Sequence, residues 1–262
     1  MTNSTADLAK ELALALHLAD AAAAVSLAGF NARTFTVERK ADKSEVTEID
    51  RATELTITNI LREQRPEHSV YGEEHGIIGP ADSPFQWVID PIDGTSNFVR
   101  GVPVWASLIA LVHKGVPVLG VVCAPALQMR WWAHTDGGAF YNSQPIHVSN
   151  IDSLRHASVS VTIDKGWDAL GAIPSLMKLQ QEVSHVRGYG DFWQHMLVAQ
   201  GAVDIAIDAI GLAPYDIAAL VPIVQEAGGK FSDRLGVPDW RANSLVTSNG
   251  LLHEAALAFL PG

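Results

Sequence analysis

The residues best suited to chemistry lie in segment 90–95, which reads Asp-Pro-Ile-Asp-Gly-Thr. The apolar stretch before it, residues 86–89, predicts a strand that ends at Asp90, because Pro91 removes a backbone donor. Asp93 and Gly94 are typical of a turn. At this spacing both carboxylates converge on one point, and like charges held so closely require a hard cation between them. An all-oxygen ligand set of this kind suits Mg²⁺ or Mn²⁺.

Two further acidic segments repeat this logic. Segment 72–74 (Gly-Glu-Glu) follows a predicted strand over 68–71, and segment 214–219 (Pro-Tyr-Asp-Ile-Ala-Ala) opens a predicted helix. A Gly-Glu-Glu triplet alone is usually a solvated loop, and we expect the adjoining His75 to be a surface residue. Segment 90–95 is therefore the more specific signal.

The three segments follow one another along the chain as 72–74, 90–95 and 214–219, and Glu-Ala-Gly-Gly-Lys follows at 226–230. This succession makes the sequence similar to the inositol monophosphatase family. Members of that family are lithium-sensitive, magnesium-dependent phosphatases, and the resemblance covers essentially the whole chain. It implies an α/β (α+β) fold, the alternating layered αβαβα sandwich of the inositol monophosphatase and fructose-bisphosphatase superfamily, and a homodimer. Tyr215 stands where the family motif has Trp, which changes the packing beside Asp216 but keeps the acid.

The resemblance also implies a ligand set. One metal would be held by Glu73, Asp90 and the backbone carbonyl of Ile92, and a second by Asp90, Asp93 and Asp216. We therefore expect two or three Mg²⁺ ions in each active site, with Mn²⁺ as a possible substitute.

Thr95 takes the water-activating position of the family, paired with Asp50. Each residue has a simpler role open to it: Thr95 as a helix N-cap, and Asp50 as part of a capping box with Thr47. The simpler and the catalytic roles are compatible. The amides of Gly94 and Thr95 are expected to hold phosphate oxygens beside Asp93.

Specificity is expected from segment 186–192 (Val-Arg-Gly-Tyr-Gly-Asp-Phe), a turn that faces the organic part of the substrate in the family. Within it Arg187, Gly190 and Asp191 are the predicted substrate-binding residues, and the carboxylate of Asp191 favours a substrate with an ammonium group. Together with segment 130–133 (Arg-Trp-Trp-Ala), this turn resembles the histidinol-phosphate phosphatase branch. That resemblance implies L-histidinol phosphate as substrate and a place in histidine biosynthesis. Asp191 could instead serve only as a helix N-cap.

Asp208 is predicted to be a second acid that faces the substrate. The family has a glutamate seven residues before the aspartate of its third motif, whereas Asp208 lies eight residues before Asp216. A one-residue insertion around 210–211 would reconcile the two spacings, so the alignment of Asp208 stays open.

These residues need elements to position them, and the sequence alternates between the two kinds. Apolar residues at steps of three and four predict a helix over 6–30 with Gly29 as its C-cap, and a capping box predicts a second helix over 48–64. Strands are predicted at these ranges: 34–38, 68–71, 86–89, 104–112, 116–122, 129–134, 139–141, 157–162 and 203–207. Helices are predicted at 167–182, 191–200 and 215–227. We expect one domain over 1–262, in two halves: 1–149 with the metal and phosphate site, and 150–262 with the specificity residues and Asp216.

Bulk composition limits the partners. The chain has 262 residues, of which 48% are hydrophobic and 18% charged, as in a globular protein with a substantial core. A net charge of −11 argues against nucleic acid or an anionic membrane as partner. The charges within the first helix predict that it does not span a membrane, and no signal-peptide pattern precedes it, so a cytoplasmic protein is expected. The single cysteine, Cys123, lies in an apolar run and is expected to be buried.

Three other interpretations are open. A relaxed inositol monophosphatase is the nearest, followed by relatives that act on nucleotide 3′-phosphates or fructose bisphosphate. A metal-binding regulatory protein that kept the fold would lose a ligand or the water-activating pair, and all of these residues are present.

Lys40 and Lys43 lie in the polar segment 39–46, which is either a solvated loop or one that closes over the site.

Overall fold

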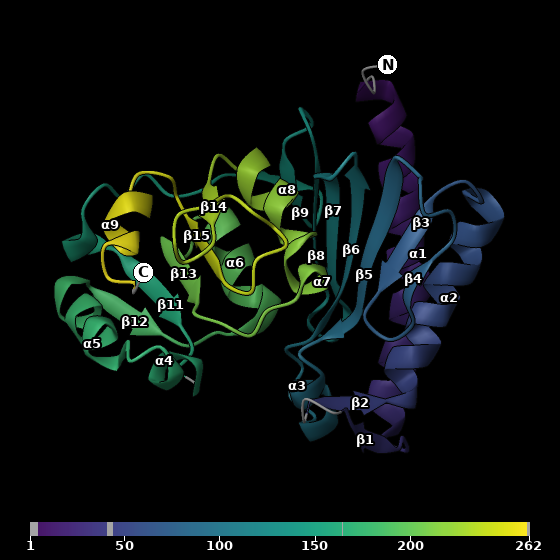
Figure 1. Cartoon of the computed structure of the whole chain (residues 1–262), viewed down its shortest axis with the longest axis horizontal. Coiled ribbons are helices and arrows are strands. Elements are labelled where there is room, and N and C mark those ends of the chain that lie inside the picture. Colours follow the sequence, from purple (N-terminus) through teal and green to yellow (C-terminus); the bar gives the residue numbers. More distant parts are fainter. Residues whose placement is uncertain (1–4, 41–43, 164, 261–262) are drawn as a thin grey trace.

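Five layers of secondary structure alternate between helices and sheets (Figure 1). The structure is a computed structural model that describes residues 5–40, 44–163 and 165–260. The order is a helix pair, an eight-stranded sheet, a central helix layer, a five-stranded sheet and an outer helix layer. This confirms the predicted αβαβα sandwich.

The first layer consists of α1 (Thr5–Ala32) and α2 (Glu48–Gln64), which pack on one face of the large sheet. Leu14, Leu18, Ile57 and Leu61 are buried in the core between helices and sheet. By length and hydropathy alone, residues 7–32 are apolar enough to cross a membrane, a property that the core helix of a globular protein can share. In this fold the apolar stripe of α1 packs against the sheet instead.

The large sheet has the strand order β10-β9-β8-β7-β6-β5-β3-β4, and its parallel pair is β3 with β5. Its strands are β3 (Ser69–Gly72), β4 (Gly76–Ile78), β5 (Phe85–Asp93), β6 (Ala106–His113), β7 (Val116–Ala124), β8 (Met129–His134), β9 (Ala139–Tyr141) and β10 (Gln144–Ile146). The prediction that the strand leading into Asp90 ends at this residue was wrong. β5 resumes pairing at Asp93, opposite Ala106, after an irregularity in register, so Pro91 sits in a bulge where no ladder bond is needed.

The second sheet has the order β12-β11-β13-β15-β14 and is covered on its two faces by different helices (Figure 1). Its strands are β11 (Ser158–Val161), β12 (His185–Arg187), β13 (Ile205–Asp208), β14 (Lys230–Ser232) and β15 (Leu245–Ser248). The central layer contains α6 (Asp191–Ala199), α7 (Pro214–Ile217) and α8 (Leu220–Glu226), and the outer layer α4 (Lys165–Ala169), α5 (Ile173–Glu182) and α9 (His253–Leu257). Helix α8 contacts β7 and β8, so the central layer joins the two sheets.

Several predicted boundaries were wrong for local reasons. The helix predicted over 167–182 is divided by a turn at Gly171, whose φ is +63°, and the one predicted over 215–227 is divided near Ala218. Gly29 does not end α1; it lies where a Cβ would be 2.8 Å from the side chain of Ile49. The strand predicted over 34–38 is β1 (Val37–Arg39), and it pairs with β2 (Glu45–Thr47) inside the predicted polar loop. A short α3 (Thr95–Arg100) follows β5.

Candidate active site

Three carboxylates from two segments of the chain meet at one point between the two sheets. One oxygen from each of Asp90, Asp93 and Asp216 lies within 4.8 Å of the others. The bulge of β5 presents Asp90 and Asp93, and the first turn of α7 presents Asp216, whose Oδ2 accepts a hydrogen bond from the amide of Ala213 at 2.7 Å. The structure therefore brings together the acids of segments 90–95 and 214–219.

Burial, together with neighbouring acids, raises the pKa values of these carboxylates. Burial, followed by the charges of Glu73, Asp93 and Asp216, holds the pKa of Asp90 well above its usual range. Burial and the charges of Asp191 and Asp216 do the same for Asp93. Burial raises the pKa of Asp216 to about 6, against the hydrogen bond from Ala213. Acids gathered in this way are stabilised in their charged form by a cation placed among them.

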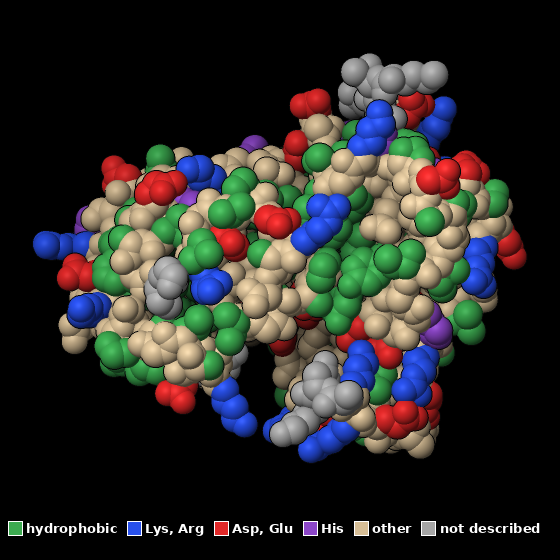
Figure 2. Space-filling model, viewed as in Figure 1, with side chains coloured by type: hydrophobic (Ala, Val, Ile, Leu, Met, Phe, Trp, Pro, Cys, Tyr) green, Lys and Arg blue, Asp and Glu red, His purple; other side chains and the backbone are tan. Residues whose placement is uncertain are grey.

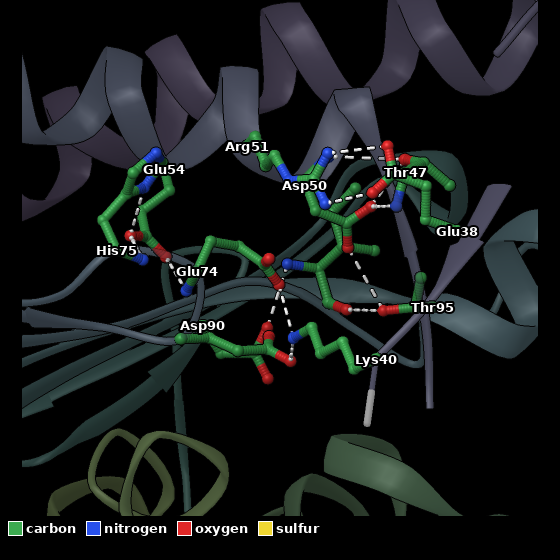
Figure 3. Close-up of polar contacts among 12 residues, drawn as sticks. Glu38, Lys40, Thr47, Asp50, Arg51, Glu54, Glu74, His75, Asp90 and Thr95 are labelled. Carbon is green, nitrogen blue, oxygen red and sulfur yellow. Dashed lines mark hydrogen bonds and ion pairs between the residues drawn. The ribbon is translucent and has the colours of Figure 1, made fainter. Parts of the chain in front are cut away.

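Glu73 lies on the turn between β3 and β4, next to this cluster. Its Oε1 accepts a hydrogen bond from Lys40 Nζ at 2.7 Å, and Oε1 of Glu74 accepts another at 2.6 Å. Burial raises the pKa of Glu73 to about 7 despite the lysine. Burial alone would lower the pKa of Lys40, but the two glutamates outweigh it and raise that pKa above its usual value. Figure 3 shows Lys40 reaching toward Glu74; Lys43 lies outside the described residues.

Glu54, which was not among the predicted site residues, stabilises the turn that contains Glu73. Its carboxylate is 1% exposed and accepts hydrogen bonds from the amides of Glu74 (2.8 Å) and His75 (2.9 Å), with His75 Nδ1 also at 2.8 Å (Figure 3). A Cβ on Gly72 would lie 2.2 Å from Glu54 Oε1, so only glycine fits there. Glu54 follows Asp50 by four residues on α2, and that helical spacing was the available signal.

Asp50 and Thr95 form the predicted pair. Thr95 Oγ1 lies 3.2 Å from Asp50 Oδ1 and 2.9 Å from the carbonyl oxygen of Ile92 (Figure 3). Asp50 Oδ2 also accepts hydrogen bonds from Thr47, at 2.9 Å from its amide and 2.5 Å from its hydroxyl, which completes the capping box of α2. Burial raises the pKa of Asp50, opposed by these bonds. One carboxylate thus serves both the cap and the site.

Two hydrogen bonds tie the layers together across the site. The amide of Phe192 donates to Asp93 Oδ2 at 2.7 Å, and Asn97 Nδ2 donates to Asp191 Oδ2 at 2.9 Å. Gly94 has a φ of +83°, and a Cβ at this position would lie 3.4 Å from Asp191 Oδ2, so the turn at Gly94 contacts the start of α6. These contacts place the start of α6 beside Asp93, and a substrate contact by Asp191 stays a prediction.

A pocket of about 210 Å³ opens beside the cluster. Its walls consist of four acids, one histidine and three apolar residues: Asp93, Asp191, Asp208, Asp216, His195, Phe192, Leu212 and Leu220. Figure 2 shows the hollow between the two halves of the molecule, with acidic side chains on its inner wall. Asp191 keeps exposed surface, yet its carboxylate is desolvated, and this, with the charges of Asp208 and Asp216, raises its pKa to about 6.

Other predicted residues lie outside this pocket. Arg187 is exposed and its guanidinium donates to the carbonyl of Val186 at 2.8 Å. Gly190 precedes α6 with a φ of +75° and shapes the turn without lining the pocket. Arg130 and Trp132 line a separate cavity between α1 and β8, where Arg130 bonds Asp20 at 2.5 Å, and Trp131 is buried in the core. Segment 130–133 therefore contributes no wall to the acidic pocket.

The donor set fits a hard divalent cation. Carboxylate oxygens from Asp90, Asp93 and Asp216, with Glu73 adjacent, match the ligands that Mg²⁺ prefers, and their raised pKa values indicate a need for positive charge. The carbonyl of Ile92 lies on the same bulge. The ammonium of Lys40 supplies one positive charge at Glu73.

Comparison with known proteins agrees with this geometry. The profile of the inositol monophosphatase family matches residues 7–260. The chain is 44% identical to a histidinol-phosphatase of Streptomyces coelicolor (97% of this chain, 98% of the relative) and 45% identical to one of Mycobacterium tuberculosis (95% and 97%). The crystal structure of extragenic suppressor protein suhB from Bartonella henselae superimposes with a TM-score of 0.89 at 27% identity, over 95% of this chain and 98% of that one. The chain belongs to the inositol monophosphatase family of metal-dependent phosphatases.

Proposed function

We propose that this protein is a histidinol-phosphatase, which hydrolyses L-histidinol phosphate to L-histidinol and inorganic phosphate. The observation that supports this best is the placement of Asp191 and Asp208 in the pocket that Asp93 and Asp216 also line. A phosphate at the acid cluster would leave the organic part of the ester beside two further carboxylates. The similarity to relatives named histidinol-phosphatase supports the same substrate.

We propose Mg²⁺ as the cofactor, with Mn²⁺ as a substitute. Glu73, Asp90 and the carbonyl of Ile92 would hold one ion, and Asp90, Asp93 and Asp216 a second. Bound Mg²⁺ supplies positive charge that lowers the pKa of a coordinated water and offsets the charge of the phosphoryl group.

The residues around the ions have separate tasks. The hydroxyl of Thr95 orients the attacking water, and Asp50, 3.2 Å from it, receives the proton through that hydroxyl. The amides of Gly94 and Thr95 hold phosphate oxygens beside Asp93, which restrains the phosphoryl group as charge spreads over its oxygens.

The organic part of the substrate would occupy the acidic end of the pocket. Histidinol carries an ammonium group and an imidazole, and carboxylates at Asp191 and Asp208 are suited to both. Gly190 lets the chain turn toward the site at a φ that other residues rarely adopt. A substrate contact by Arg187, a homodimer and a cytoplasmic location all stay predictions.

A substrate comparison tests the proposal. We expect kcat/KM for L-histidinol phosphate to exceed that for inositol 1-phosphate and fructose 1,6-bisphosphate by about tenfold or more, because only histidinol phosphate carries an ammonium group. All turnover should disappear with EDTA and return with Mg²⁺. If inositol 1-phosphate were preferred tenfold, the substrate assignment would be wrong. If no ester were hydrolysed, a regulatory metal-binding role would replace it.

A further inference from the structure

A buried polar network stands behind the acidic pocket and ends on Asp208. Oδ2 of Asp208 lies 2.8 Å from His195 Nε2 and accepts a hydrogen bond from Gln194 Nε2 at 2.7 Å. The side chain of His195 is only 1% exposed, whereas that of Asp208 is 19% exposed and lines the pocket. The network therefore presents the carboxylate of Asp208 to the pocket, and His195, which also borders the pocket, is almost completely buried.

The partners of His195 define the tautomer of its neutral ring. Its Nδ1 lies 2.8 Å from Thr247 Oγ1 on β15. A neutral imidazole has one donor and one acceptor nitrogen, and the carboxylate oxygen of Asp208 is an acceptor. The Nε2 hydrogen thus points at Asp208, and the Thr247 hydroxyl donates to Nδ1. Because both nitrogens are engaged within the protein, His195 has none left to act as acid or base on a substrate.

Gln194 extends the network toward Asp191. Its Oε1 accepts a hydrogen bond from Ser160 Oγ at 2.9 Å, and that hydroxyl accepts one from the amide of Tyr189 at 3.2 Å. Tyr189 belongs to the turn that leads into Asp191. A chain of hydrogen bonds through Gln194 and Ser160 therefore links Asp208 to the turn that leads into Asp191.

The pocket has an unusual charge balance. Four of the residues that line it are aspartates, and none of the described residues that line it is lysine or arginine. Asp93 and Asp216 belong to the metal cluster, which leaves Asp191 and Asp208 for the organic part of a ligand. Asp191 has one oxygen bonded to Asn97, and Asp208 has Oδ2 bonded twice, while Asp208 Oδ1 has no hydrogen-bond partner among the described residues.

We infer that His195 is a specificity-determining positioning residue: its Nε2 hydrogen fixes Asp208 so that Oδ1 is presented to the ammonium group of the substrate. The inference rests on the proposed function, since it assigns a task within the same pocket. A buried, bonded histidine could equally serve stability alone. The two roles differ in one respect: only positioning makes the loss depend on whether the substrate carries an ammonium group.

Three variants test the role. His195→Phe keeps the ring size but removes the donor, and His195→Gln places an amide donor where Nε2 lies. Thr247→Val leaves the histidine in place and removes the hydroxyl that orients it. His185→Phe, at an exposed histidine of β12, is the matched control. Each is assayed with L-histidinol phosphate and with its analogue that lacks only the amino group, and binding of L-histidinol is measured by calorimetry.

We expect His195→Phe and Thr247→Val to lower kcat/KM for L-histidinol phosphate by about tenfold, mainly through KM, because a misdirected carboxylate loses a charge-assisted bond. L-Histidinol binding should weaken by a similar factor. The analogue should change less than about twofold, and His195→Gln should recover most of the loss. The control should match wild type with both substrates.

Equal losses with both substrates, or no recovery by His195→Gln, would overturn the positioning role while the wild-type preference kept the proposed function intact. If Phe at 195 fails to fold, Thr247→Val decides the same question. If wild-type enzyme turns over the analogue as well as L-histidinol phosphate, ammonium recognition is absent, which overturns the substrate assignment and this inference together.

Discussion

Asp93 occupies two environments at once, the metal cluster and the junction with α6. Its oxygen lies within 4.8 Å of those of Asp90 and Asp216, and its Oδ2 also accepts the amide hydrogen of Phe192. Asp93→Asn keeps the size of the side chain and removes its charge. We expect turnover to fall by at least about a hundredfold, because a ligand charge is lost. The metal-free variant should unfold at the same or a higher temperature, because one of several mutually repelling acids is gone.

Activity assays and calorimetry on the same sample check this prediction. The variant should also show a smaller Mg²⁺-induced rise in unfolding temperature than wild type, since metal binding is weakened. Retention of more than a few per cent of activity would count against the proposed ligand set. Asp82→Asn, in an exposed turn, is the control.

The role of the Thr95 hydroxyl is tested by comparing Thr95→Ser with Thr95→Val. Serine keeps the hydroxyl that lies 3.2 Å from Asp50 and 2.9 Å from the carbonyl of Ile92, and valine keeps only the shape. We expect Thr95→Ser to retain most of kcat and Thr95→Val to lose about a hundredfold or more, as general-base catalysis is removed. Because α3 begins at this residue, circular dichroism and unfolding temperature are measured alongside. The N-cap of α3 is Gly94, without a side-chain cap, so the predicted capping role of Thr95 was wrong. Equal kcat in both variants would overturn the water-activating role of Thr95.

Some of these site residues could be predicted from the sequence, and others could not. Segment 90–95 could be interpreted because proline, glycine and two acids at fixed offsets constrain one turn, and Thr47 with Asp50 specify a capping box through four consecutive residues. Glu54, Gln194 and His195 could not be recognised in the same way, since a lone glutamate or histidine in a helix has no local signature. Their helical spacing from Asp50 and Asp191 becomes informative only after those acids are placed.

At the scale of elements, α2 supports the site at two points one helical turn apart. Asp50 faces Thr95, and Glu54 accepts the amides of the Glu73 turn. Glu54→Gln replaces one acceptor oxygen with a donor that opposes those amides. We expect the Mg²⁺ concentration for half-maximal activity to rise about fivefold to tenfold, as for loss of an outer partner of a metal ligand. Glu63→Gln, exposed on the same helix, should leave it unchanged.

Titration with Mg²⁺ by calorimetry, in the absence of substrate, gives a second readout for Glu54. Weaker binding with an intact fold is the predicted result. Unchanged Mg²⁺ affinity together with a lower unfolding temperature would show that Glu54 stabilises the turn without tuning the metal site.

His253 links α9 to the second sheet and makes that contact sensitive to pH. Its two nitrogens lie 2.9 Å from the hydroxyls of Ser232 and Ser248, and burial lowers its pKa below 6.5. The unfolded chain therefore binds a proton at higher pH than the folded one does. This contribution to stability is present above about pH 6.5 and is lost as pH falls through the folded pKa.

The pH dependence of unfolding temperature tests this contact. Between pH 7.5 and 5.5, wild type should lose more stability than His253→Gln, because the variant has no group to titrate there. The raised carboxylate pKa values of the active site act in the opposite direction and are common to both proteins. Parallel curves for the two proteins would refute a titrating role for His253.

At the scale of the whole molecule, the site exists only because two sheets are held face to face. β5 supplies Asp90 and Asp93, while α6, α7 and β13 supply Asp191, Asp216 and Asp208. The alternation of elements in the sequence predicted the layers, but not the distances between them. The boundaries that failed, such as the break at Gly171 and the continuation of β5 past Pro91, depend on contacts with other layers. The division of the single domain into halves 1–149 and 150–262 stays a prediction.

The account depends on divalent ions seated among these acids, and an anomalous diffraction measurement tests that most directly. Crystals soaked in Mn²⁺ should give anomalous peaks bounded by Asp90, Asp93 and Asp216, with a second peak toward Glu73 and the carbonyl of Ile92. Asp93→Asn crystals treated in the same way should lose or weaken the peak at the three aspartates. An active wild-type enzyme with no anomalous peak at this cluster would contradict the account.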